Sequence, residues 1–132
     1  MEKALGTEFE FTSAAFPPYD DRVDAVQPGL YGRRLAEFLQ RELEARGFRV
    51  RCLLAEDWGW VVELHNEAFP LWIGCASDME TPNAFRCFIE PSRSYVWRRW
   101  RRVPTAPAVA PVAEAVAAIL ADSVENLRRF CG

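Results

Sequence analysis

Four short apolar stretches that follow one another between Phe48 and Glu90 constrain the fold of this chain more than any other feature. They read FRVRCLL, WVVELHNE, FPLWIGCAS and AFRCFIE, and polar or glycine-containing segments separate them. Within each stretch apolar residues alternate with other types, which is the pattern of a strand with one face in a core. The chain is therefore predicted to form an antiparallel meander of four strands, with Glu56–Gly59 as its first turn.

Amphipathic segments on both sides of the meander are predicted to be helices that pack on its apolar face. The first runs from Pro28, which suits an initial helical turn, to Arg46, with Gly47 as a C-terminal cap. Its apolar side at helical spacing is Leu30, Tyr31, Leu35, Phe38, Leu39 and Leu43. The last helix is expected to begin between Ala108 and Val112, with Val112, Ala113, Val116, Ile119 and Leu120 as its buried stripe.

The N-terminal part adds one more strand. Leu5–Ser13 alternates, whereas Phe16–Gln27 contains two prolines and an acidic cluster and is predicted to cross the surface, held by Phe16 and Tyr19. A length of 132 residues fits one domain, residues 1–132. The predicted fold class is α+β with two layers: an antiparallel sheet of about five strands, in the order β-α-β-β-β-β-α, with the helices on one face.

Between the meander and the last helix, the local signals predict helix and rigid coil. Ser94 can cap a short helix, Tyr95–Arg102, that places Trp100 in the core and ends at Pro104. Thr105–Pro111 is proline-rich and is predicted to be a rigid link. After Asp122 the last helix is expected to break and restart as Ser123–Phe130, with Leu127 and Phe130 packed.

The alternation also predicts which side of the sheet each residue occupies. The inward side comprises Phe48, Val50, Cys52, Leu54, Trp60, Val62, Leu64, Phe69, Leu71, Ile73, Cys75, Phe85, Cys87 and Ile89. The outward side comprises Arg49, Arg51, Val61, Glu63, His65, Trp72, Arg86, Phe88 and Glu90. Folding alone does not explain Trp72 and Phe88 on a face that meets water. Either the segment Phe16–Gln27 covers them or they form a patch for a partner.

The outward side offers one candidate for catalysis. His65, the single histidine, is predicted to share it with Glu63, Arg86 and Glu90, which could act as acid, base and anion-holding groups. A solvated polar strand face produces the same set of residues. Signatures for a nucleophilic serine, a zinc protease, a phosphate loop or a dinucleotide site are absent.

The cysteines bear on cofactors, the distribution of charge bears on partners, and the apolar runs bear on the location of the protein. The inward cysteines and the lack of a CxxC pair favour reduced thiols over a metal site, and no cofactor is expected. The run Trp97–Arg102 resembles a patch that binds nucleic acid. The net charge of −3 and the six acids of the first 27 residues instead favour arginines that are solvated or paired. Nucleic acid is therefore not expected as a partner. Without a signal peptide or an apolar run of about 20 residues, a cytoplasmic protein without membrane association is expected.

Four motifs carry a resemblance to a known family. GRRLAEFL (Gly32–Leu39), EDWGW (Glu56–Trp60), LWIGC (Leu71–Cys75) and CFIEPS (Cys87–Ser92) together resemble a family of small uncharacterised bacterial proteins, over most of the chain. The resemblance implies a bacterial protein and no established activity or catalytic residue.

These observations favour a protein-binding module, of the immunity or adaptor type, that uses the outward sheet face. Its partner would be another protein or a second copy of the chain. The predicted binding residues are Trp58, Trp60, Glu63, His65, Trp72, Arg86, Phe88 and Glu90. The alternative is a small enzyme that uses Glu63, His65, Arg86 and Glu90, and nucleic-acid binding is a third hypothesis.

Overall fold

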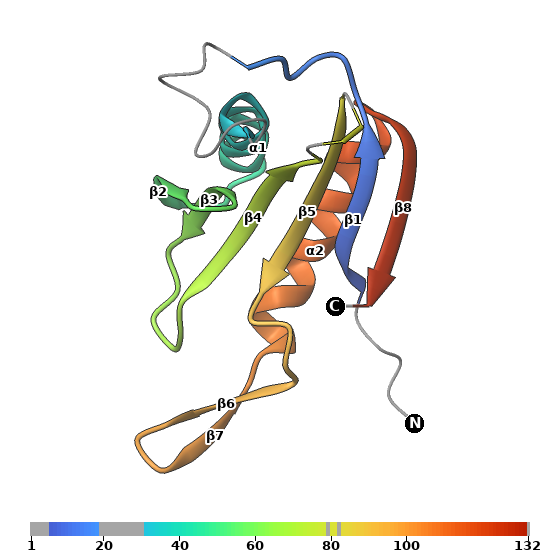
Figure 1. Ribbon diagram of the computed structural model, residues 1–132. Helices are drawn as coiled ribbons and strands as arrows, with labels where there is room; N and C mark the ends of the chain where they lie inside the picture. Colours follow the sequence, from blue (N-terminus) through green and yellow to red (C-terminus); the bar gives the residue numbers. More distant parts are fainter. Residues whose placement is uncertain (1–5, 19–30, 79, 82, 132) are drawn as a thin grey trace.

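The computed structural model describes residues 6–18, 31–78, 80–81 and 83–131, which form an α+β fold with two layers (Figure 1). The elements are β1 (Gly6–Thr12), α1 (Arg33–Ala45), β2 (Val50–Glu56), β3 (Gly59–Leu64), β4 (Leu71–Ser77), β5 (Ala84–Glu90), β6 (Tyr95–Arg98), β7 (Arg101–Pro104), α2 (Ala106–Ala121) and β8 (Glu125–Cys131). The main sheet has six strands in the order β2-β3-β4-β5-β1-β8, and β6 and β7 form a separate pair. The predicted fold class is confirmed, with a higher number of strands than expected.

Both helices lie on the same face of the six-stranded sheet (Figure 1). Helix α1 contacts β2, β3 and β4, whereas α2 contacts β5, β1 and β8. The core between the layers contains the fully buried side chains of Phe9, Leu39, Val62, Ile73 and Ile119. Each such side chain contributes about 1.5–3 kcal/mol through burial, so this interface supplies most of the driving force for folding.

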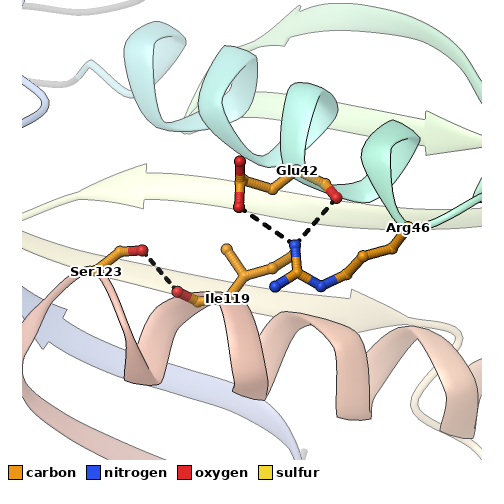
Figure 2. A network of polar contacts seen from close by, with 4 residues as sticks. All are labelled: Glu42, Arg46, Ile119 and Ser123. Atoms are coloured by element: carbon orange, nitrogen blue, oxygen red, sulfur yellow. Dashed lines mark hydrogen bonds and ion pairs between the residues drawn. The ribbon is translucent and has the colours of Figure 1, made fainter.

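Local bonds close the ends of both helices. After α1, the N–H of Gly47 bonds to the carbonyl of Glu44 and that of Phe48 to the carbonyl of Leu43, both at 3.0 Å, with Gly47 at φ 90°. This is the glycine cap that the sequence predicts. Figure 2 shows the side chains at the C-terminal ends of the two helices. Arg46 donates to the carbonyl and the carboxylate of Glu42 at 3.2 Å after α1, and Ser123 donates to the carbonyl of Ile119 at 2.7 Å after α2.

The start of α1 differs in part from the expectation. The described helix begins at Arg33, and Pro28 lies outside the described residues. The N–H of Tyr31 donates to the hydroxyl of Ser77 at 2.9 Å, which ties the entry of the helix to the end of β4. Gly32 fits there because a Cβ atom would lie 2.7 Å from the carbonyl oxygen of Cys75.

Strand β8 replaces the predicted helix Ser123–Phe130. It pairs with β1, which lies between β5 and β8 at the position in the sheet that the sequence left open. Pairing satisfies backbone groups that β1 would otherwise present as an open edge. That gain is tertiary, so the capping pattern after Asp122 does not reveal it. Phe130 is 39% exposed and is therefore not packed as expected, whereas Leu127 contacts the core.

A β-hairpin, β6–β7, replaces the predicted helix Tyr95–Arg102. Val96 and Val103 pair across the hairpin and pack against the core. Arg99 and Trp100 form the turn with φ values of 48° and 68°, the sign that a type I′ turn requires. Trp100 is 97% exposed, so its predicted core position is wrong. Such φ values cost about 1–2 kcal/mol for each non-glycine residue.

The proline-rich segment Thr105–Pro111 is not a rigid link, because α2 starts within it, before the predicted start between Ala108 and Val112. Helix α2 begins at Ala106, and Pro107 lies in its first turn, where the missing N–H has no helical partner to lose. Pro111 is exposed within the helix, and the neighbouring Val109 and Val112 are buried. Burial of this apolar side therefore offsets the hydrogen bond that Pro111 lacks. The predicted buried stripe of this helix is confirmed.

A bulge in β2 corrects the predicted sides of two residues. Val50 pairs with Leu64 but Cys52 pairs with Glu63, so one extra residue, Arg51, lies between them. Because the side-chain period of a strand is two, the extra residue turns Cys52 and Leu54 to the face without helices. Leu53 packs against the core instead.

The assignment of faces predicts unequal costs for two truncations. Ile73→Ala, at a fully buried site, should lower the free energy of unfolding by about 2–5 kcal/mol. Leu54→Ala, at a site that is 42% exposed, should cost at most about 1 kcal/mol. Urea unfolding followed by circular dichroism measures both. Similar losses for the two variants would contradict the assignment.

Candidate functional site

Three aromatic side chains gather on the sheet face that the helices leave open. Trp72 belongs to β4, Phe88 to β5 and Trp58 to the turn between β2 and β3. Their ring centroids are separated by 5.2 Å for Trp58 and Phe88, 5.7 Å for Trp72 and Phe88, and 6.1 Å for Trp58 and Trp72. These separations are those of interacting aromatic pairs. We refer to these three residues as the aromatic cluster.

A glycine in β4 makes room for the cluster. Gly74 pairs with Phe88 on one side and with Val61 on the other. A Cβ atom at Gly74 would lie 2.3 Å from the ring of Phe88, so the ring lies directly over this glycine. Val61, although it is on the open face, is only 6% exposed. The aromatic rings thus bury one another and their apolar neighbour, and they remain half-exposed.

A groove of about 420 Å³ runs beside the cluster. Its lining combines apolar residues with two acids: Leu54, Glu56, Trp58, Val61, Glu63, Pro70 and Trp72. Leu54 is 42% exposed and lies on the edge strand β2, where an incoming chain can reach it. The open face therefore has an apolar groove as well as half-exposed aromatic rings.

Charged groups surround the cluster, and each has a local bond. Arg86 pairs with Glu8 of β1, and its guanidinium lies 4.7 Å from the ring centroid of Phe88. Glu63 accepts from Arg51 and from the thiol of Cys52, both at 3.5 Å. Glu90 accepts from the backbone N–H of Ser92 at 3.0 Å. This is the arrangement of an apolar centre with a polar rim.

Six of the eight predicted binding residues share the open face: Trp58, Glu63, Trp72, Arg86, Phe88 and Glu90. Trp60 lies on the helix side, where Arg33 is 5.5 Å from its ring centroid and where the alternation of β3 places it. His65 is exposed one residue beyond the end of β3, and its N–H bonds to the carbonyl of Arg49 at 2.9 Å.

The proposed acid–base group is divided by a tryptophan. Trp72 pairs with Glu63 on one side and with Glu90 on the other, so about 10 Å separates the backbones of the two acids. The enzyme hypothesis stays a prediction, with its carboxylates on opposite sides of the Trp72 ring.

Covering of the cluster by the segment Phe16–Gln27 was the other possibility. Phe16 itself packs on the helix side, with its ring centroid 5.2 Å from that of Phe38. Residues 19–27 lie outside the described residues.

Sequence reasoning missed several residues of this site. Alternation predicts Leu54 and Cys52 on the inward side, because the sequence of β2 contains no signal for the bulge at Arg51. Gly74 did carry a signal, since a glycine within a strand often marks a close approach of another group. The sequence does not predict that Glu8 belongs to the site, because its place there depends on the pairing of β1 with β5.

Two cysteines that face opposite sides differ in environment. Desolvation, followed by the hydrogen bond to Glu63 and the charge of that carboxylate, raises the pKa of Cys52. Cys75 and Cys87 pair across β4 and β5 and are buried on the helix side. The hydrogen bond to Cys87, followed by desolvation, raises the pKa of Cys75.

Metal and membrane sites do not emerge from the described part of the chain. Within residues 6–18, 31–78, 80–81 and 83–131, no group of three or more His, Cys, Asp or Glu side chains could hold a metal ion. None of the helices formed by these residues is long and apolar enough to cross a membrane.

Comparison with protein-family models, curated proteins and solved structures finds no match to this chain. The resemblance carried by the EDWGW, LWIGC and CFIEPS motifs therefore stays a prediction.

Thiol labelling tests the two cysteine environments. With a disulfide reagent at mildly alkaline pH, Cys131 should react first and Cys52 more slowly, because a raised pKa leaves less thiolate. Glu63→Gln removes the negative charge and should accelerate labelling of Cys52, whereas Glu42→Gln, on α1, should not. Peptide mass spectrometry assigns each thiol. Labelling of Cys75 or Cys87 in the folded protein as fast as Cys52 would contradict the structure.

Proposed function

We propose that this protein is a protein-binding module whose binding surface is the open face of the six-stranded sheet. The observation that carries the proposal is the aromatic cluster of Trp58, Trp72 and Phe88 beside an apolar groove. The part of these half-exposed rings that meets water is apolar surface, and an approaching apolar surface would remove it from water with a gain in free energy. Tryptophan and arginine are also the residues that most often anchor protein interfaces.

The chemistry of the groove suggests what the partner contributes. Leu54, Val61 and Pro70 form an apolar lining that suits a protruding aliphatic or aromatic side chain of the partner. Glu56 and Glu63, which also line the groove, favour basic or hydrogen-bonding groups next to that side chain. The partner is another protein or a second copy of this chain. A role of the immunity or adaptor type in the bacterial cytoplasm, as expected from the sequence, belongs to the same proposal.

A charge placed in the groove tests the proposal. Leu54→Arg should leave the fold intact, because the site is exposed on an edge strand, and should weaken partner binding by at least about tenfold. Partners are isolated from a lysate of the source cell with the wild-type protein, and each purified candidate is then titrated calorimetrically. Light scattering measures self-association in parallel.

The matched control is Ala118→Arg, which adds the same charge on the exposed side of α2. It should bind as the wild type does. Equal affinities for Leu54→Arg and the wild type, or a wild type that neither self-associates nor captures a stoichiometric protein, would refute the proposal.

A further inference from the structure

The β6–β7 hairpin is a second surface, distinct from the open sheet face. It carries the sequence YVWRRWRRVP from Tyr95 to Pro104 and extends away from the six-stranded sheet (Figure 1). Trp97 is 73% exposed and Trp100 is 97% exposed. The sequence contains no Asp or Glu between Glu90 and Glu114, and the hairpin contains four arginines: Arg98, Arg99, Arg101 and Arg102.

The hairpin arginines form no ion pair within the described part of the chain, and Arg98 donates to the backbone carbonyl of Ala68 at 2.8 Å. Of the acids near the N-terminus, Glu8 pairs with Arg86 and Glu10 with Arg128. No ion pair among residues 6–18, 31–78, 80–81 and 83–131 reaches the hairpin arginines. The sequence predicted a buried Trp100 together with solvated or paired arginines. Trp100 is instead 97% exposed, and the four hairpin arginines are exposed, as solvated arginines are.

The residues at the tip are unfavourable for the turn itself. Arg99 and Trp100 both adopt positive φ, which asparagine and glycine adopt at far lower cost. Folding of the hairpin therefore does not explain an arginine and an almost fully exposed tryptophan at these positions. A ligand that uses their side chains does.

Aromatic and cationic groups alternate on one side of the hairpin. Trp97 pairs with Arg102, and Tyr95 lies two residues before Trp97 on the same side, at a spacing of about 7 Å. The guanidinium of Arg102 lies 4.0 Å from the ring centroid of Tyr95. A groove of about 520 Å³ is lined by the four hairpin arginines together with Glu67, Ala68, Val103 and Pro104.

We propose that the hairpin binds single-stranded nucleic acid. Bases would stack on Trp97 and Trp100, and the hairpin arginines would contact the phosphates that connect them. The same chemistry would serve single-stranded DNA and RNA. This surface is independent of the open sheet face, so it does not rest on the proposed protein-binding function.

The order of residues at the tip argues against an anionic membrane as the ligand. Arg99 precedes Trp100 in the turn, and Arg98 and Arg101 pair directly below it. Insertion of Trp100 into the acyl region would carry these guanidinium groups with it, at a high desolvation cost. Stacking on a base requires no such transfer.

Fluorescence anisotropy with labelled oligonucleotides tests the proposal. Mixed-sequence DNA and RNA single strands of about 12 nucleotides are compared with the matching duplex and with vesicles of phosphatidylcholine and phosphatidylserine. The single strands should bind most tightly. With the four arginines engaged, the plot of log affinity against log salt should have a slope of about −3, since each phosphate contact contributes about −0.7.

Trp100→Gly separates binding from folding. The glycine suits the positive φ, so the thermal midpoint should stay equal or rise, while affinity should fall by about tenfold through the lost stacking. Arg101→Gln, outside the turn, should reduce the salt slope by about 0.7. Arg41→Gln, an exposed change on α1, removes the same charge away from the hairpin and is the control that should leave affinity unchanged.

A preference for DNA or for RNA single strands would show whether the hairpin favours deoxyribose or ribose in its ligand. Either preference would support the proposal. Tighter binding to the duplex, binding to the vesicles without binding to the oligonucleotides, or an unchanged affinity of Trp100→Gly would each overturn it.

Discussion

Burial of one face of an antiparallel sheet beneath two helices is the interaction on which the rest of the structure depends. Alternation along β3, β4 and β5 sends Val62, Ile73 and Ile89 under α1 and α2. The same alternation then fixes what the opposite face presents, because successive side chains must point in opposite directions. Trp72 and Phe88 are thus on the open face as a direct consequence of where the core lies, and Gly74 leaves the space that the ring of Phe88 occupies.

The features that suggest function are those that folding does not require. A solvated sheet face is stable with short polar side chains, yet here tryptophan and phenylalanine rings cover one another there. A two-residue hairpin turn forms most easily with asparagine and glycine, yet here it contains Arg99 and Trp100. Natural sequences tend to depart from local rules at functional sites, and both surfaces depart from such rules. They also differ in character, since the first is apolar with a mixed rim and the second is strongly cationic.

The sequence predicted the elements whose signals are local and repeated. The meander, the N-terminal strand, the cap at Gly47 and the buried stripe of α2 follow from periodicity and from glycine chemistry. The elements it missed depend on distant partners. Strand β8 forms because β1 offers an edge, the hairpin forms because Val96 meets Val103 across it, and the bulge at Arg51 depends on pairing with β3. For the same reason the aromatic cluster could be anticipated from Trp72 and Phe88, whereas the groove beside Leu54 could not.

Hydroxyl-radical footprinting of the folded protein tests most directly whether the sheet has one covered and one open face. Mass spectrometry reports the oxidation rate of each aromatic side chain. Trp72 and Phe88 should be oxidised several-fold faster than Phe9 and Phe85, which are at most 3% exposed under the helices. Equal protection of all four rings, or faster oxidation of Phe9 and Phe85, would contradict the account of the fold and of the surface derived from it.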